Sequence, residues 1–238
     1  MILPVRPAFL MGYTEDMNYS AIIVAAGSGS RTQLSFNKVL YPWKGKPILE
    51  LALQRFRNDP DCTQIVLVCA PSEIEDFSCR FEGEKTEFVC GGSTRQRSVL
   101  QGLSRVSNEF VLIHDGARPF VSQDLIDRIK AALRDHCSVV PGIPVVDTIK
   151  EVDENGLVIR TPKRSGLRGI QTPQAFRSDL VKDALKKAEA SQAQVTDDAM
   201  AVELFEYIPT FCVDGEASNL KITNPEDLER IHQLRQDG

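Results

Sequence analysis

The sequence has little of what marks several large classes of protein. Aromatic residues make up 7% of its 238 residues, and the 28 basic residues are outnumbered by 33 acidic ones. The resulting net charge of −5 argues against nucleic-acid binding, which usually requires a basic face. No uninterrupted apolar run approaches the roughly 20 residues of a membrane-spanning helix, so no membrane contact is expected either. The remaining composition, 42% hydrophobic and 26% charged, is that of an ordinary globular protein.

Cysteine pairs and targeting signals are also missing. The six cysteines include no C-x-x-C pair, which argues against a zinc ribbon or a redox motif. We expect buried free thiols in a reducing cytosol. Residues 1–17 contain two prolines and no small-residue cleavage site, so they resemble neither a signal peptide nor a transit peptide. We interpret them as a flexible extension, or as the result of a start codon assigned too early with Met17 as the true start. We expect a cytoplasmic location, with a plastid location also left open.

From residue 20 onward, apolar runs alternate with helical patterns. Continuous apolar strands separated by helices are typical of a parallel sheet that is covered on both faces. The sequence therefore predicts an α/β fold with a Rossmann-like, mostly parallel sheet. The expected strands are 20–26, 65–70, 86–90, 110–114 and 138–140, and the expected helices are 46–57, 93–106 and 122–134.

The alternation changes in the second half of the chain. Residues 145–152 and 157–161 alternate as strands around Asn155-Gly156, which is a strong hairpin signal. We expect an arm at about 145–170 that protrudes from the sheet. The rest of one domain, spanning 18–238, is completed by helices at 178–189 and 197–205, strands at 210–213 and 219–222, and a last helix from 225.

A glycine-containing loop, AAGSGSRT (25–32), follows the first expected strand. Glycines at this place let backbone N–H groups approach phosphate oxygens closely. A P-loop is excluded because no lysine follows at the required spacing, and a dinucleotide-binding motif lacks its third glycine at Thr32. Arg31 and Lys38 could instead hold a triphosphate. The simpler alternative is a tight turn beside two solvated cations.

Further motifs follow in a fixed order, and together they carry a resemblance. The chain resembles the 2-C-methyl-D-erythritol 4-phosphate cytidylyltransferase family from about residue 19 to about residue 234. The resemblance implies transfer of a cytidylyl group from CTP to methylerythritol 4-phosphate, with release of pyrophosphate, in non-mevalonate isoprenoid synthesis. The motifs are AAGSGSR-x6-K (25–38), GGSTRQRSV (91–99), HDGARPF (114–120), VVDTIK (145–150), QTPQAF (171–176), TDDA (196–199) and NLKIT (219–223).

The resemblance also implies roles for single residues. Arg31 and Lys38 match the pair that stabilises the transition state, whereas Arg164 and Lys221 match the pair that positions the substrate. The nucleotide would be bound by Ala25, Ala26, Gly27, Gly92, Ser93, Ser98 and Asp115. The polyol phosphate would be bound by Arg118, Thr148, Arg164, Thr172 and Thr196.

Asp115 ends the fourth expected strand, at the sheet edge where α/β proteins bind ligands. A carboxylate there suits Mg²⁺, directly or through water, and other divalent cations are also compatible. His114 beside it is interpreted as structural.

The arm predicts a homodimer. A protruding hairpin cannot bury its apolar face alone, and the resemblance implies arms that cross between subunits. Arg164 would then reach the substrate phosphate of the neighbouring site.

Departures and alternatives remain. The family commonly has proline before the loop lysine and glutamine after it, where this chain has Asn37 and Val39; a proline would have fixed φ there. Ribitol 5-phosphate cytidylyltransferases share the loop, the D-x-x-R and the TPQ motif, but TPKRSGL (161–167) and TDDA favour the first activity. A nucleotide-binding module without catalysis is the third possibility.

Overall fold

A computed structural model of the chain describes residues 17–27 and 36–233. Its centre is an eight-stranded sheet in the order β10-β7-β11-β6-β1-β4-β5, with β12 also paired to β7. The strands are β1 (Tyr19–Val24), β4 (Cys62–Cys69), β5 (Thr86–Cys90), β6 (Phe110–Asp115), β7 (Ser138–Pro144), β10 (Arg168–Ile170), β11 (Gln174–Arg177) and β12 (Phe211–Asp214).

Most of the sheet is parallel. β1 pairs in parallel with β4 and β6, β4 with β5, and β12 with β7. β11 is antiparallel to both β6 and β7, and β10 is antiparallel to β7. The predicted α/β class with a mostly parallel sheet is therefore confirmed.

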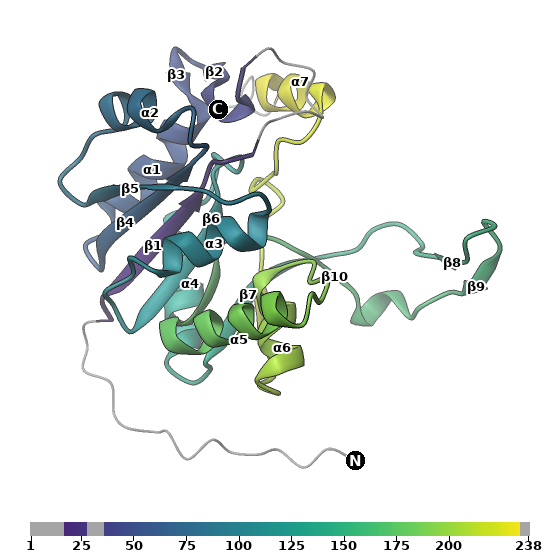
Figure 1. Cartoon of the computed structure of the whole chain (residues 1–238). Coiled ribbons are helices and arrows are strands. Elements are labelled where there is room, and N and C mark those ends of the chain that lie inside the picture. Colours follow the sequence, from purple (N-terminus) through teal and green to yellow (C-terminus); the bar gives the residue numbers. More distant parts are fainter. Residues whose placement is uncertain (1–16, 28–35, 234–238) are drawn as a thin grey trace.

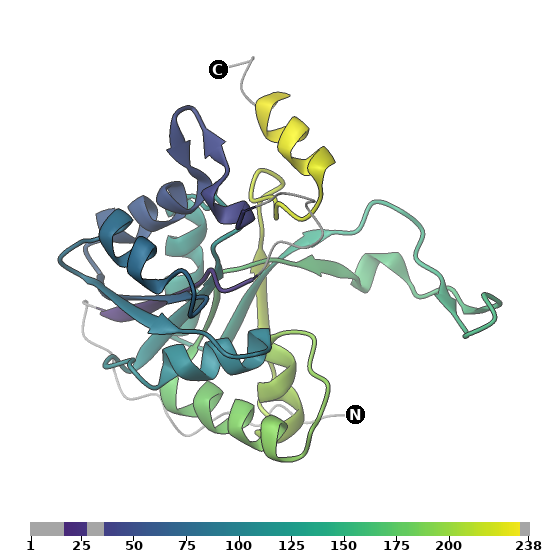
Figure 2. The same ribbon diagram turned by 45° about the horizontal axis from the view of Figure 1, so that its top comes forward.

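Helices cover both faces of the sheet (Figures 1 and 2). Alternate residues of the buried strands face opposite ways: Ile23 and Leu67 belong to one apolar core, whereas Ile22 and Val66 belong to the other. The first core is closed by α1 and α4, and the second by α3, α5 and α6. The helices are α1 (Ile48–Asn58), α2 (Ile74–Arg80), α3 (Arg95–Leu103), α4 (Gln123–Leu133), α5 (Ser178–Ala190), α6 (Asp198–Phe205) and α7 (Pro225–Gln233).

Two short elements precede α1, and helix α7 packs against them. The 3-10 helix η2 (Lys38–Leu40) leads into the small β2–β3 hairpin, Pro42–Trp43 and Lys46–Pro47. Trp43 packs edge to face against Phe120 and, with Ile48 and Ile222, forms a small core under α7. This core fixes the segment before α7 against the start of α1.

The predicted arm is present and projects away from the sheet (Figure 1). Strands β8 (Glu151–Val152) and β9 (Val158–Arg160) pair antiparallel around the turn at Gly156, where φ is +82°. Glycine is favoured there because other residues rarely adopt a positive φ. The return limb runs through the 3-10 helix η3 (Arg164–Gly166).

Several expected elements differ from the structure. Residues 219–222 are not a strand, because Asn219 and Ile222 use their backbone groups in separate bonds to Arg118 and Ala117. Of 145–152 only the last two residues are a strand. Helix α1 begins after Pro47, which stands at its N-cap position.

Three smaller expectations concern the cysteines, residues 1–17 and membrane-spanning helices. All six cysteines are free, as predicted, but Cys79, Cys90 and Cys212 are exposed and not buried. The predicted extension 1–17 lies outside the described residues except for Met17, which packs in the first core. Within the described part of the chain, no helix has the length and apolar character needed to cross a membrane.

Candidate active site

A cleft of about 430 Å³ opens at the carboxyl ends of the parallel strands. Open α/β sheets bind ligands at this edge, because the loops there leave the strands on either side of a crevice. The cleft gathers seven of the predicted nucleotide residues and two of the predicted cations. They are Ala25, Ala26, Gly27, Gly92, Ser93, Ser98, Asp115, Lys38 and Lys221.

The β1 end forms one wall of the cleft. Ala25 continues from β1 and its N–H bonds the carbonyl of Val68 on β4, which keeps this stretch next to the sheet. Gly27 is exposed at the mouth of the cleft. Arg31, the other cation predicted from this loop, lies outside the described residues, so its role stays a prediction.

Asn37, the residue directly before Lys38, is fixed by hydrogen bonds of its own side chain. Its side-chain amide donates to the carbonyl of Ala25 and to Glu73 Oε2, both at 2.9 Å, and its Oδ1 accepts from the N–H of Val39 at 3.3 Å. Its φ of −60° lies within the range that proline fixes. The loop thus has a backbone angle that a proline would impose, stabilised here by side-chain hydrogen bonds.

The β5–α3 loop forms the opposite wall, and its glycines are required by close packing. A Cβ on Gly91 would lie 2.6 Å from the Cβ of Ala26, and one on Gly92 would lie 2.4 Å from the Cβ of Arg97. Ser98 accepts from the N–H of Gly92 and donates to the carbonyl of Thr94. The Ser98 hydroxyl therefore shapes the loop, whereas the loop backbone faces the cleft.

Asp115 lies at the base of the cleft between two cations. Its Oδ1 is 3.2 Å from Arg95 Nε, and its Oδ2 is 2.7 Å from Lys221 Nζ. Burial alone would raise the pKa of this carboxyl, but the charges of Arg95, Lys221 and Arg118 outweigh it and hold the pKa well below its ordinary value. Asp115 is therefore ionised at neutral pH.

His114 faces away from the cleft, as the structural interpretation expected. Its Nε2 is 3.0 Å from the carbonyl of Arg118, so this nitrogen carries the proton. The hydroxyl of Thr172 then donates to Nδ1 at 3.1 Å and accepts from the N–H of Asp115 at 3.1 Å. Burial lowers the pKa of His114 to about 4, which keeps the ring neutral.

Arg118 and Thr172, both predicted to bind the polyol phosphate, are buried and form hydrogen bonds within the protein. Arg118 is 9% exposed and donates to the carbonyl of Asn219 at 2.7 Å. Asn219 in turn donates to the carbonyl of Thr172. These bonds fasten the segment that carries Lys221, so both residues stand close behind the cleft.

The other predicted polyol-phosphate residues are not brought to the cleft by this chain alone. Thr148 and Arg164 lie on the arm, where Arg164 Nη1 donates to the carbonyl of Val146 at 2.6 Å. Thr196 is exposed and its hydroxyl contacts Met200 Sδ. Their roles stay predictions that require a second chain or a bound ligand.

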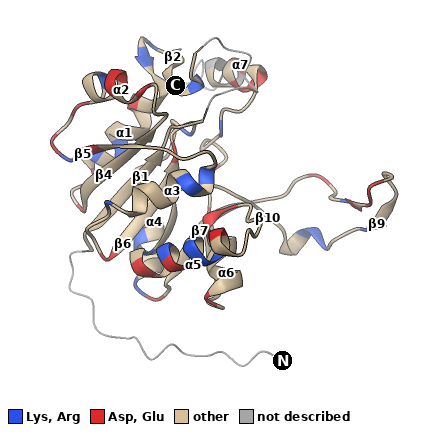
Figure 3. Cartoon of the chain, in the orientation of Figure 1, with Lys and Arg blue, Asp and Glu red and all other residues tan. Residues whose placement is uncertain are grey.

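Two charged residues of the site were not singled out from the sequence. Arg95, in the middle of GGSTRQRSV, lines the cleft, and its guanidinium forms an ion pair with Asp198 of the TDDA motif, donating a hydrogen bond to Oδ1. Figure 3 shows basic residues at this end of α3. The motifs were visible, but nothing local in either one indicates that they meet.

Comparison with known proteins identifies a family that covers almost all of the chain. The model of the family described as 2-C-methyl-D-erythritol 4-phosphate cytidylyltransferase matches residues 19–234. A protein of that name from Bacillus velezensis is 40% identical over 89% of this chain and 93% of its own length. One from Clostridium novyi is 42% identical over 87% and 92%.

Solved structures give the same result. A 4-diphosphocytidyl-2C-methyl-D-erythritol synthase from Anaerococcus prevotii superposes with a TM-score of 0.82 and 34% identity, over 93% of this chain and 97% of that one. A cytidylyltransferase from Thermus thermophilus gives 0.77 and 33%, over 92% and 100%. The fold and the cleft, with these matches, define a nucleotidyltransferase enzyme. Within that class, the chain belongs to the 2-C-methyl-D-erythritol 4-phosphate cytidylyltransferase family.

Proposed function

We propose that this cleft binds CTP and transfers its cytidylyl group to 2-C-methyl-D-erythritol 4-phosphate. The observation that carries the proposal is the grouping of Lys38, Asp115 and Lys221 around one cleft at the carboxyl ends of the strands. Two cations that line one cleft suit a reaction between two phosphate groups, because each can bind one of the reacting partners. The product belongs to isoprenoid precursor synthesis by the non-mevalonate route.

The reaction needs no nucleophile from the protein. An oxygen of the acceptor phosphate attacks the α-phosphorus of CTP, a new P–O bond forms, and the bond from the α-phosphorus to the bridging oxygen breaks. Pyrophosphate leaves with the electron pair of that bond. The enzyme's part is to position the two phosphates and to stabilise charge in the transition state. We assign that stabilisation to Lys38 and Arg31.

Asp115 is also the residue that we assign to Mg²⁺. The fit is reasonable because Mg²⁺ typically takes one or two carboxylates and completes its shell with phosphate oxygens and waters. Within the described residues, no cluster of three or more metal-ligating side chains exists, so the triphosphate would supply the other ligands. When bound, the ion would neutralise charge on the triphosphate.

Arg164 and Thr148 would act in the site of a second subunit. This proposal is supported by the apolar surface of the arm: Val146, Leu157 and Ile159 are 81%, 68% and 60% exposed. A second chain could cover these side chains and would receive the guanidinium of Arg164. Lys221 would bind the acceptor phosphate within its own chain. The cytoplasmic location expected from the sequence stays a prediction.

The proposal is tested by product analysis. Purified protein with Mg²⁺, CTP and methylerythritol 4-phosphate should release pyrophosphate and form CDP-methylerythritol, identified by ³¹P NMR. Ribitol 5-phosphate serves as the competing acceptor and ATP as the competing nucleotide. Faster use of ribitol 5-phosphate would favour the alternative acceptor. CTP binding without any product would favour the non-catalytic module.

A further inference from the structure

Arg95 stands where a helix normally avoids a cation. It is the first residue of α3, and the first turn of this helix contains Arg95 and Arg97 but no acidic residue. The helix dipole favours anions at this end, so an arginine there is opposed by the backbone. The cost is offset by two carboxylates that approach Arg95 from other parts of the chain.

The guanidinium divides its donors between these carboxylates. Nη1 and Nη2 lie 3.0 and 2.9 Å from Oδ1 and Oδ2 of Asp198, while Nε lies 3.2 Å from Oδ1 of Asp115. The Asp198 side chain is 1% exposed, so its charge is almost fully removed from water. The planar fork of arginine spreads its donors over the two carboxylates in a fixed geometry, which the point charge of a lysine ammonium does not reproduce.

Arg95 consequently joins three segments that border the cleft. It begins α3, directly after the loop of Gly92 and Ser93, whereas Asp115 ends β6 and Asp198 begins α6. The other oxygen of Asp115 holds Lys221 at 2.7 Å. A chain of charge-assisted bonds therefore runs from the buried Asp198 through Arg95 and Asp115 to Lys221.

We propose that Arg95 is a positioning residue, which acts through Asp115 to place Lys221 for the acceptor phosphate. In this series of bonded side chains, Asp198 is the buried anchor and Asp115 is the residue that faces the ligands. The inference rests on the proposed function, since it takes Lys221 to be the acceptor side of the site. It predicts that Arg95 affects use of the acceptor more than affinity for CTP.

The test compares Arg95→Gln with Arg97→Gln, a matched control on the same helical turn. Arg97 forms one ion pair with Glu189 at 2.8 Å and is 56% exposed. Arg95→Gln should raise the KM for methylerythritol 4-phosphate by about tenfold or more, because a charge-assisted bond is lost. The dissociation constant for CTP, measured by calorimetry, should change much less. Arg97→Gln should leave both values near those of the wild type.

A double variant separates positioning from stability. Arg95→Gln leaves Asp198 as an uncompensated buried charge, so the melting temperature should fall. Adding Asp198→Asn removes that charge and should recover much of the melting temperature, while the raised KM remains because Asp115 still lacks its partner. This variant also supplies the measurement where Arg95→Gln alone does not fold.

Three results would overturn the inference. They are a normal KM in Arg95→Gln, a KM restored by the second substitution, and a loss of CTP affinity without a change in KM. The wild type is assayed first with the same two substrates. Absence of turnover in the wild type would refute the proposed function. If the wild type is active, the variants alone decide whether the inference holds.

Discussion

Lys221 and Asp115 form an ion pair of 2.7 Å between Nζ and Oδ2, which joins the segment before α7 to the end of β6. The Asp115 side chain is 11% exposed and that of Lys221 is 37% exposed, so the pair presents its cation to the cleft. Under the proposed function, an incoming acceptor phosphate would share this ammonium with the carboxylate, and the pair would set where the acceptor binds.

Replacing Asp115 should disable the site without unfolding the protein. Asp115→Asn removes the charge that faces Arg95 and Lys221, and kcat/KM should fall by about 10² or more. The Mg²⁺ concentration for half-maximal rate should rise, because the one carboxylate that we assign to the ion is gone. Asp76→Asn, at an exposed ion pair on α2, is the control. An unchanged Mg²⁺ dependence would remove Asp115 from the metal site.

Lys38→Ala should lower turnover far more than it weakens CTP binding. One lost donor to the transition state typically reduces the rate by about 10²–10³. Steady-state kinetics and calorimetry measure the two effects separately. Lys46→Ala, which removes an exposed lysine on β3, should change neither. Near-normal turnover of Lys38→Ala would exclude this lysine from the mechanism.

The loop before Lys38 offers a test of backbone geometry. Asn37→Ala frees φ and removes three hydrogen bonds, so kcat should fall by about tenfold as Lys38 loses its position. Asn37→Pro should keep more turnover than Asn37→Ala, because the observed φ of −60° suits proline. Asn37→Asp should be the worst, since it places a carboxylate against Glu73. Equal rates in all three would show that this residue does not position the lysine.

Shared sites should be revealed by mixing two inactive variants. In a heterodimer of Lys38→Ala with Arg164→Ala, one site carries both lesions and the other carries neither. Activity should therefore return toward a quarter of the wild-type value for randomly mixed subunits, by the statistics of pairing. Mass spectrometry would establish that subunits exchange. No recovery after proven exchange would place Arg164 in its own chain's site or in none.

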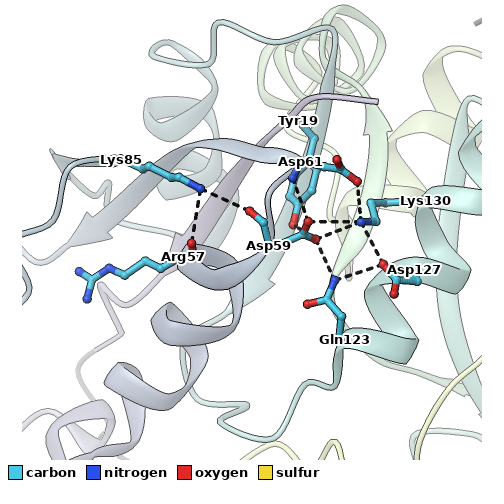
Figure 4. Close-up of polar contacts among 8 residues, drawn as sticks. All are labelled: Tyr19, Arg57, Asp59, Asp61, Lys85, Gln123, Asp127 and Lys130. Atoms are coloured by element: carbon cyan, nitrogen blue, oxygen red, sulfur yellow. Dashed lines mark hydrogen bonds and ion pairs between the residues drawn. The ribbon is translucent and has the colours of Figure 1, made fainter. Parts of the chain in front are cut away.

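A buried cluster on α4 and the α1–β4 turn predicts how stability depends on pH (Figure 4). Asp59 accepts from Tyr19 at 2.9 Å and from Gln123 at 3.0 Å, and Lys130 pairs with it at 3.2 Å. Burial alone would raise the pKa of Asp59. The bonds from Gln123, the Asp61 N–H and Tyr19, with the charge of Lys130, outweigh burial and lower the pKa below its ordinary 3.8.

The lowered pKa fixes the sign of the effect. Below pH 3.8, the ordinary pKa of Asp59, the side chain binds more protons in the unfolded chain than in the folded protein. The stability that Asp59 contributes is therefore present above this pH and is lost as the pH falls through the folded-state pKa. Asp59→Asn should reduce the free energy of unfolding at neutral pH by about 1–3 kcal/mol. The difference from the wild type should shrink in urea titrations as the pH falls below the ordinary value of 3.8 and through the lowered folded-state pKa.

Asp127→Asn provides the control for this cluster. Asp127 also pairs with Lys130, at 2.9 Å, but its side chain is 54% exposed. An exposed pair is worth at most about 1 kcal/mol. Catalysis should be normal in both variants, since neither residue borders the cleft. A constant difference between Asp59→Asn and the wild type across the acid range would refute the assigned pKa shift.

The sequence predicted the parallel half of the fold well because its strands are continuous apolar runs buried on both faces. It missed β10 and β11, which are short strands. β10 pairs with β7 and β11 pairs with both β6 and β7, and no local pattern specifies these partners. It also missed α2, whose seven residues follow Pro71 and bury only Phe77. The predicted strand at 219–222 was wrong because the backbone of Asn219 and Ile222 bonds Arg118 and Ala117 separately, while Ile222 packs in a small core beside α7.

The site shows a similar division. The ordered motifs indicated the loops that line the cleft, and strand ends brought Asp115, Gly92 and Gly27 to the same edge. The pairing of Arg95 with Asp198 could not be predicted, because it depends on how α3 and α6 pack on one face of the sheet. Buried roles for Arg118 and Thr172 likewise follow from tertiary contacts.

The exposed apolar side chains of the arm have a consequence for measurement. A site completed by two chains is subject to mass action, so the specific activity should fall when the enzyme is diluted below its dimer dissociation constant. Rates measured at very low enzyme concentration would then understate kcat, and after rapid dilution the rate would decline with time as subunits separate. Plotting activity per chain against enzyme concentration would give the strength of the association without any structural probe.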